Sequence, residues 1–132
     1  MEGHGKPMVV LVTAGQRHEA PMLRCLLEAG AVKRPGRGRP RIRPDAVAGD
    51  KGYSYPSIRR YLRRRGIRAV IPSKSNQPRQ RRFDKPAYRE RNRVERAINR
   101  LKQFRRVATR YEKREVNYLA MVTIAAIMLW LE

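Results

Sequence analysis

The segment from residue 84 to residue 104 constrains the fold of this chain more than any other stretch. It contains no glycine, and its one proline, Pro86, falls in the first turn of a helix for which Asp84 is the expected N-cap. Apolar side chains recur along it at helical spacing, which predicts a helix that packs one face on a core. These apolar residues are Val94, Ala97, Ile98, Leu101 and Phe104.

A second group of side chains gathers on a neighbouring face of the same predicted helix. Tyr88, Arg91, Glu95 and Lys102 span four turns, yet they occupy roughly one-sixth of the helix circumference at about 100° per residue. Glu95 is thus a lone carboxylate at the border between core and solvent, with cations beside it. Such a position can hold a divalent metal or a phosphate. The alternative is a solvated basic helix whose arginine and glutamate side chains pair at helical spacing.

The rest of the chain alternates between strand-like and helix-like segments. Strands are predicted at residues 8–12, 46–49 and 68–72, and helices at residues 19–29, 54–65 and 117–131. We expect Ser54 to cap the second of these helices, and Gly30 and Gly66 to lie just past the ends of the first and the second. Cys25 falls within the first of these helices, where a small buried hydrophobic residue is the expected role. The order β-α-β-α-β-α plus a C-terminal apolar helix predicts an α/β fold with a largely parallel sheet.

Two basic segments interrupt this alternation. Residues 33–45 form a loop rich in proline and glycine, and residues 73–82 form a polar, basic loop that we expect to be mobile. Arg37 and Arg39 belong to an Arg-Gly-Arg-Pro sequence that is similar to an AT-hook. The alternatives are a basic loop that contacts phosphates non-specifically and a plain solvated linker.

The charge balance points to a polyanionic partner. Lys and Arg number 32 against 11 Asp and Glu, which gives a net charge of +21. Nucleic acid is the expected partner, and a membrane surface fits less well because the basic residues are spread over several segments. Residues 118–131 carry no charge, but a helix of that length reaches only about 21 Å and is too short to cross a bilayer. We expect a cytoplasmic protein with no membrane association.

Two carboxylates carry the candidate chemistry. Asp50 follows the predicted strand at residues 46–49, and catalytic groups in α/β sheets gather at the carboxyl ends of strands. Together with Glu95 it suggests two-metal phosphoryl transfer, in which Mg²⁺ or Mn²⁺ is held by carboxylate oxygens. The alternative for Asp50 is an aspartate that stabilises the following turn through Lys51 and Gly52.

Four segments carry a resemblance to a known family. The pattern Tyr88-x-x-Arg91-x-x-x-Glu95-x-x-x-x-x-x-Lys102 resembles the signature around the catalytic glutamate of DDE-type transposases of bacterial insertion sequences. Asp50-Lys51-Gly52-Tyr53 resembles the segment that holds their second catalytic aspartate. The sequence from Thr13 to Glu19 is similar to their Thr-x-Gly-Gln loop, and the sequence from Arg105 to Tyr111 is similar to the segment after their glutamate helix.

The resemblance implies a ribonuclease-H-like catalytic core that acts in DNA transposition. In the family, Mg²⁺ held by an Asp-Asp-Glu triad drives hydrolytic nicking at the terminal inverted repeats of the element, and the freed 3′-hydroxyl attacks target DNA. Asp50 would be the second metal ligand and Glu95 the third. The residues that would contact DNA phosphates are Tyr88, Arg91 and Lys102 around Glu95, Lys51 beside Asp50, and Arg37 and Arg39.

The chain departs from the family pattern at the first aspartate. It has no aspartate before Asp45, and Glu2 falls in a turn rather than on the expected strand. We therefore expect residues 1–132 to be the C-terminal portion of a transposase catalytic domain, either truncated or completed by an upstream transposase fragment. On this interpretation the chain binds DNA in the bacterial nucleoid, is inactive alone, and acts as a homo-oligomer. The alternative is a non-catalytic basic DNA-binding protein or an inactive transposase remnant.

Overall fold

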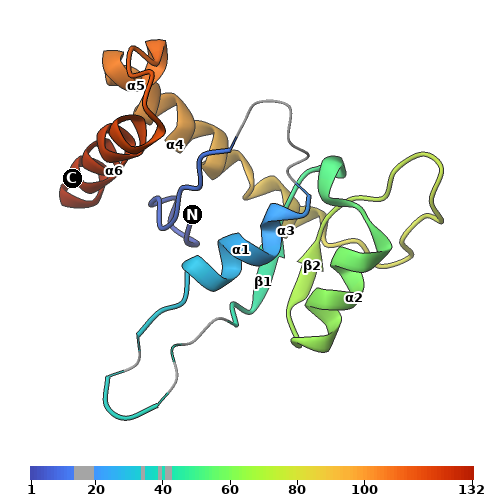
Figure 1. The fold of residues 1–132 in the computed structure, drawn as a ribbon. Helices are drawn as coiled ribbons and strands as arrows, with labels where there is room; N and C mark the ends of the chain where they lie inside the picture. Colours follow the sequence, from blue (N-terminus) through green and yellow to red (C-terminus); the bar gives the residue numbers. More distant parts are fainter. Residues whose placement is uncertain (14–19, 34, 39, 41–42) are drawn as a thin grey trace. The chain divides into compact units, whose positions relative to one another are not determined.

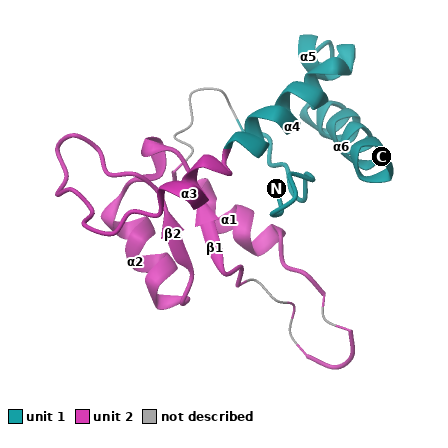
Figure 2. Cartoon of the chain, turned by 180° about the vertical axis from the view of Figure 1, so that it is seen from behind, with its two compact units in different colours: residues 1–16, 92–132 teal, residues 17–91 magenta. Residues whose placement is uncertain are grey.

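The chain folds into two compact units. The computed structural model describes residues 1–13, 20–33, 35–38, 40 and 43–132. Unit 1 comprises Met1–Gln16 and Asn92–Glu132, and unit 2 comprises Arg17–Arg91 (Figure 2). Each unit has its own cluster of buried apolar side chains.

Unit 2 is built around a small parallel sheet. Its elements are α1 (Met22–Ala29), β1 (Ala46–Ala48), the short 3₁₀ helix η1 (Lys51–Tyr53), α2 (Pro56–Arg64), β2 (Arg68–Val70) and α3 (Lys85–Arg89) (Figure 1). β1 and β2 pair in parallel, with Val47 opposite Ala69. The helix α2 connects the two strands, as a parallel pairing requires. The prediction of an α/β chain with parallel strands is thus confirmed for these two strands.

The core of unit 2 lies between the sheet and helices α1 and α2. Leu62 and Ile71 are completely buried there, and Leu23, Ile58 and Ile67 are nearly so. The end of α2 follows the predicted local rules. Gly66 adopts a left-handed conformation (φ +66°), and the backbone N–H of Ile67 donates to the carbonyl of Leu62 at 2.9 Å. This bond satisfies a carbonyl group at the end of α2, and the left-handed conformation of Gly66 directs the chain toward β2.

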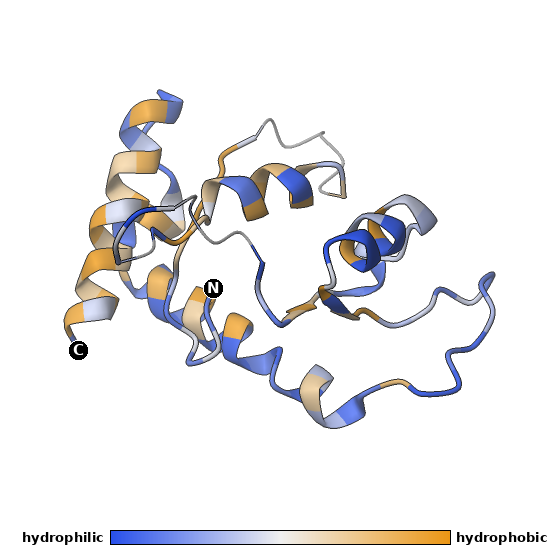
Figure 3. Ribbon diagram, turned by 90° about the horizontal axis from the view of Figure 1, so that it is seen from below, coloured by the Kyte–Doolittle hydropathy of each residue, from blue (hydrophilic) through white to orange (hydrophobic). Residues whose placement is uncertain are grey.

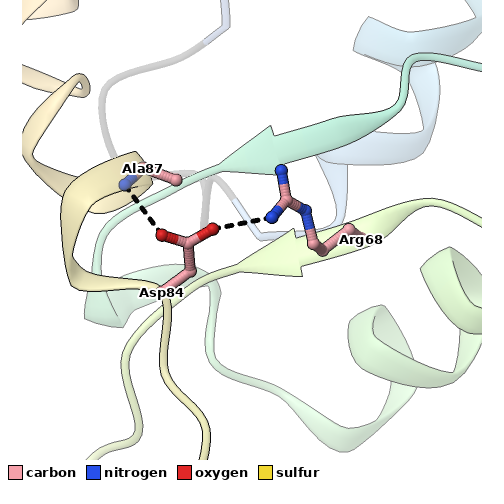
Figure 4. Close-up of polar contacts among 3 residues, drawn as sticks. All are labelled: Arg68, Asp84 and Ala87. Atoms are coloured by element: carbon pink, nitrogen blue, oxygen red, sulfur yellow. Dashed lines mark hydrogen bonds and ion pairs between the residues drawn. The ribbon is translucent and has the colours of Figure 1, made fainter.

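Asp84 caps α3 as the sequence predicts. Its Oδ1 accepts a hydrogen bond from the backbone N–H of Ala87 at 2.9 Å, and Pro86 lies in the first turn. Its other carboxylate oxygen forms an ion pair of 2.6 Å with Arg68 on β2 (Figure 4). One carboxylate therefore starts the helix and ties it to the sheet of the same unit.

The long helix predicted from residue 84 to residue 104 is not continuous. α3 ends at Arg89, the chain turns at Glu90 and Arg91, and α4 (Asn92–Gln103) begins after this turn. The boundary between the two units falls at the same place. Helical periodicity in the sequence cannot reveal such a break, because no glycine or proline marks it. The expectation of one continuous helix that carries Tyr88, Arg91, Glu95 and Lys102 is therefore wrong.

Unit 1 consists of α4, α5 (Arg105–Thr109) and α6 (Glu115–Leu131), with the N-terminal residues packed against them. Leu101, Val107, Val122, Ala125 and Leu129 form its buried core. Of the predicted apolar stripe on α4, Ala97 and Leu101 are buried, whereas Ile98 is 41% exposed. The helix buries a narrower face than the stripe suggests.

Residues 8–12 do not form the predicted strand. They have no regular secondary structure, and the side chains of Met8 and Leu11 are exposed. The segment is held instead by helical partners, since Val10 packs on the core and the indole N–H of Trp130 donates to the Pro7 carbonyl at 2.6 Å. An extended apolar run becomes a strand only when another strand pairs with it.

The C-terminal helix α6 confirms the predicted apolar helix and begins two residues earlier than expected. Val122, Ala125 and Leu129 face the core, whereas Ile124, Ile127 and Met128 are about half exposed. Hydrophobic residues cover most of this helix in Figure 3. None of the helices in the described ranges is both long and apolar enough to span a membrane.

Cys25 is exposed on α1, contrary to the prediction that it is buried. Leu23 and Leu27 of the same helix face the core. Because Cys25 lies two residues from each, it points to the opposite side of the helix.

Candidate functional site

Asp50 lies at the carboxyl edge of the parallel sheet in unit 2. It comes two residues after β1, and the backbone N–H of Gly49 bonds to the carbonyl of Val70 at 3.2 Å, which continues the pairing with β2 up to this point. The carboxylate of Asp50 is exposed. The structure therefore confirms that a short strand delivers Asp50 to the sheet edge, where α/β proteins gather functional groups.

One oxygen of the Asp50 carboxylate is fixed by the local backbone. Oδ1 accepts a hydrogen bond from the backbone N–H of Gly52 at 2.8 Å, and this bond caps η1. The turn-stabilising role that the sequence left open is thus present. Within the described ranges the second oxygen, Oδ2, has no hydrogen bond or ion pair. The carboxylate is held in one orientation and keeps one oxygen for another partner.

Lys51 follows Asp50 directly and is exposed in η1. Its ammonium group is the cation nearest to Asp50 in the sequence. An exposed ammonium on a four-carbon stem suits a contact with a phosphate oxygen.

A polar network that the sequence did not predict lies at the same sheet edge. Ser54 was expected to cap α2, but the N-cap is Tyr55, and Ser54 is completely buried. The Ser54 hydroxyl donates to Oε1 of Gln77 at 2.6 Å and accepts from Nη2 of Arg59 at 2.9 Å. Arg59 also donates to the carbonyl of Ile71 at 2.8 Å. The only signal in the sequence was a pair of glutamines, Gln77 and Gln80, in a segment otherwise rich in arginine.

The network holds Arg59 without a carboxylate. Among the described residues its guanidinium bonds only to uncharged oxygens, those of Ser54, Ile71 and Pro72. Burial lowers the pKa of Arg59, because desolvation disfavours the charged form. Because no carboxylate among its described partners neutralises it, the positive charge of Arg59 adds to the basic character of this edge.

Glu95 and Lys102 lie on α4 in unit 1, and both are exposed. They are separated by about two helical turns, so they face the same side of the helix. Glu95 falls in the first turn, where a carboxylate is favoured by the backbone dipoles. Of the four residues predicted to share a helix face, Glu95 and Lys102 thus do so.

Tyr88 and Arg91 belong to unit 2, whereas α4 belongs to unit 1. The guanidinium of Arg91 sits over the Tyr88 ring, 5.5 Å from its centroid. The Phe83 ring contacts the Tyr88 ring, with ring centroids 5.4 Å apart. Tyr88 and Arg91 thus form a pair of their own in a different unit from Glu95 and Lys102.

The predicted linker arginines are only partly covered by the structure. Arg37 is exposed, in a stretch with no helix or strand, whereas Arg39 lies outside the described residues. No group of three or more His, Cys, Asp or Glu side chains placed to hold a metal ion occurs among the residues that the structure describes. Asp50 and Glu95 belong to separate units, so the structure of each unit contains one of the two predicted ligands.

Comparison with known proteins places these features in a family. The model of the "Transposase DDE domain" family matches residues 1–131. A protein of Burkholderia cepacia, described as a transposase for insertion sequence element IS402, is 33% identical over 113 residues, which cover 86% of this chain and 51% of the relative. The chain thus spans about half the length of this relative. No solved structure shows a significant match. Because the family model covers nearly all of its length, the chain belongs to the DDE-type transposases of insertion sequences.

Proposed function

We propose that this chain acts in DNA transposition and that Asp50 and Glu95 are its metal-binding carboxylates. The observation that carries the proposal is the position of Asp50, exposed at the carboxyl edge of a parallel strand with one oxygen fixed by Gly52. The match of residues 1–131 to the transposase family supports the reaction type. The parallel pair β1 and β2, joined by α2, is consistent with part of a ribonuclease-H-like core.

The residues fit a divalent cation by the chemistry of their donor atoms. Carboxylate oxygens are the ligands that Mg²⁺ and Mn²⁺ prefer. The bond from Gly52 orients the Asp50 carboxylate, so less side-chain freedom is lost on metal binding. Glu95 is exposed on α4.

The proposed reaction is hydrolytic nicking of DNA followed by strand transfer. A bound divalent cation would supply activation of the attacking oxygen and stabilisation of the leaving oxygen. Water attacks a phosphorus atom at the element end, and the bond to the 3′ oxygen breaks and leaves a 3′-hydroxyl. The chain's own cations bind and orient the DNA, namely Lys51 next to Asp50, Lys102 on α4, the Tyr88–Arg91 pair, Arg37 and Arg39.

The first aspartate of the family's triad has no match in this sequence, in which Asp45 is the first aspartate. We propose that an upstream transposase segment supplies it. On this view DNA with the element's terminal inverted repeats is bound by an assembly that holds more than one copy of the chain. The net charge of +21 supports the DNA partner, since it favours contact with phosphates.

The test is Mn²⁺-dependent nicking of supercoiled DNA by the full chain, with and without an added polypeptide that carries the family's first-aspartate region. Asp50→Asn is the sharpest variant, because asparagine keeps an oxygen that can accept the Gly52 N–H and so preserves the turn. With the first-aspartate polypeptide added, we expect nicking by the unaltered chain and at least about a hundredfold loss in Asp50→Asn and in Glu95→Gln, because each removes a metal-binding charge.

Glu115→Gln is the matched control. It removes one exposed carboxylate from the first turn of another helix in unit 1. Nicking at the wild-type rate is expected for this variant. The proposal is contradicted if Asp50→Asn and Glu95→Gln nick as fast as Glu115→Gln.

A second candidate is a DNA-binding protein without catalysis. The hydrogen bond from Gly52 to Asp50 favours it, because that bond gives Asp50 a structural role that needs no metal. This candidate predicts salt-sensitive DNA binding that is unchanged in both carboxylate variants, with no cleavage under any condition. The same assay therefore separates the two functions.

A further inference from the structure

Hydrogen bonds anchor the loop between β2 and α3 to the sheet edge. Figure 1 shows the path of this loop. Gln77 donates from Nε2 to the backbone carbonyl of Ser54 at 2.7 Å. Gln80 donates to the carbonyl of Ile71 at 2.8 Å and to the hydroxyl of Ser73 at 3.1 Å. Two neutral amides thus fasten the loop to the residues that follow β1 and β2.

The bonds inside the loop add to this anchoring. The Ser73 hydroxyl donates to the carbonyl of Pro78 at 3.0 Å, and Oε1 of Gln77 accepts from the backbone N–H of Lys74 at 3.2 Å. The Lys74 ammonium lies over the ring of Tyr55, 4.0 Å from its centroid. The loop therefore has a defined path in which polar side chains bind backbone groups.

The arginines of this loop point outward. The side chain of Gln80 bonds to the sheet edge, whereas its neighbours Arg79 and Arg81 are exposed. Arg82 is exposed as well. Within the described ranges none of these three arginines has an ion pair or hydrogen bond. By contrast, Arg24, Arg68 and Arg106 are each paired with a carboxylate.

The loop has no carboxylate of its own. No Asp or Glu occurs from residue 73 to residue 83, so nothing in the loop neutralises its cations. Most of its length is hydrophilic in Figure 3. Unpaired guanidinium groups are complementary in charge to a row of phosphates. Because hydrogen bonds already hold the loop in place, little conformational entropy remains to be lost when it binds them.

We infer that the loop at residues 73–82 is a preformed DNA-backbone contact in which Gln77 and Gln80 hold Arg79 and Arg81 at the sheet edge that also carries Asp50. This inference rests on the proposed function, because that function makes DNA the polyanion. The contact is to phosphates and carries no base specificity. Its place beside Asp50 puts bound backbone next to the carboxylate.

The experiment measures the affinity of the full chain for a labelled DNA duplex of about 20 base pairs across a series of salt concentrations. Arg79→Gln/Arg81→Gln removes two loop cations that have no structural contact. The slope of log affinity against log salt should become shallower by about 1.8, since each phosphate contact contributes about 0.9. Arg60→Gln/Arg63→Gln is the matched control, since it removes two exposed cations from α2 of the same unit.

A second variant tests the anchoring. Gln77→Ala/Gln80→Ala keeps every charge and releases the loop, so the salt slope should stay the same while the affinity falls by about tenfold, because the loop must then be ordered on binding. Far-ultraviolet circular dichroism checks that this variant keeps its helices. Because the arginine variant leaves all these anchors intact, it tests the contact even if the glutamine variant unfolds.

The outcomes separate this inference from the proposed function. DNA binding by the unaltered chain with equal slopes for the loop variant and the α2 control would overturn the loop contact and leave the proposed function standing. No DNA binding by the unaltered chain would overturn both. A shallower slope for the loop variant alone would establish the contact whether or not the chain nicks DNA.

Discussion

Gln77 and Ser54 bind each other twice across 23 residues of sequence. The Gln77 amide donates to the Ser54 carbonyl at 2.7 Å, and the Ser54 hydroxyl donates to Oε1 of Gln77 at 2.6 Å. Ser54 is completely buried, and the Arg59 guanidinium also bonds to its hydroxyl at 2.9 Å. This pair joins the turn after Asp50 to the basic loop, and it was not predicted from the sequence.

We expect Ser54→Ala to lower the free energy of unfolding of unit 2 by about 1–3 kcal/mol, because it leaves buried polar partners without their bond. Urea denaturation followed by circular dichroism measures the change. Ser57→Ala is the control, since Ser57 is exposed in α2 only three residues further on. Equal stability of the two variants would contradict a structural role for the buried hydroxyl.

Gly66→Ala should destabilise unit 2 by about 1–2 kcal/mol, because an L-residue is strained in the left-handed conformation. Gly66 has φ +66°, and an added Cβ would also meet the guanidinium of Arg43. Thermal unfolding monitors the change. Gly3→Ala should leave the melting temperature unchanged, since Gly3 has no atom within 4 Å of an added Cβ. A melting temperature for Gly66→Ala as high as that of the unaltered chain would rule out this strain.

Asp84→Ala should cost about 1–2 kcal/mol, because it removes both the cap on Ala87 and the ion pair with Arg68 (Figure 4). Asp84→Asn keeps a capping oxygen and loses only the exposed ion pair, so it should cost less than about 1 kcal/mol. Equilibrium denaturation of the two variants side by side measures both terms. If asparagine proves as damaging as alanine, the ion pair and not the cap stabilises α3.

Glu2 should make unit 1 less stable in acid. Desolvation acts to raise the pKa of its carboxyl, but the hydrogen bonds from the backbone N–H groups of His4 and Lys6, both 2.8 Å, outweigh it and lower the pKa. The folded state thus favours the charged form. Its contribution is fully present above the ordinary glutamate pKa and is lost as pH falls through the lowered pKa.

Glu2→Gln provides the measurement for this prediction. The stability difference between the unaltered chain and Glu2→Gln, obtained from unfolding curves at several acidic pH values, should shrink as the pH falls. A carboxyl titration of Glu2 by nuclear magnetic resonance should show a midpoint below that of an ordinary glutamate. A stability difference that is independent of pH would refute the role of these two backbone bonds.

The elements that the sequence predicted well are those set by neighbouring residues. Asp84 begins a helix because its carboxylate reaches a backbone N–H only three residues away. Gly30 and Gly66 follow helix ends as expected. Each of these depends on steric or hydrogen-bonding preferences within one turn of chain.

The predictions that failed depended on distant partners. The apolar run at residues 8–12 packs through Val10 on the core of unit 1 and pairs with no strand among the described residues. The helix through Glu90 and Arg91 is broken at the boundary between two units, although its periodicity continues. Ser54 was predicted to cap a helix, but distant Gln77 draws it into a buried network.

For the candidate site, the sequence by itself selected the residues that we propose to carry the chemistry. The motifs around Asp50 and Glu95, the excess of arginine and the strand before Asp50 are all local patterns, and they also identified the family. Only the tertiary structure decided that Asp50 and Glu95 belong to different units, and that Gln77 and Gln80 anchor the basic loop. The physical reason is that these outcomes depend on contacts between residues far apart in the chain, and such contacts form only when side chains from separate elements find the same core or backbone group.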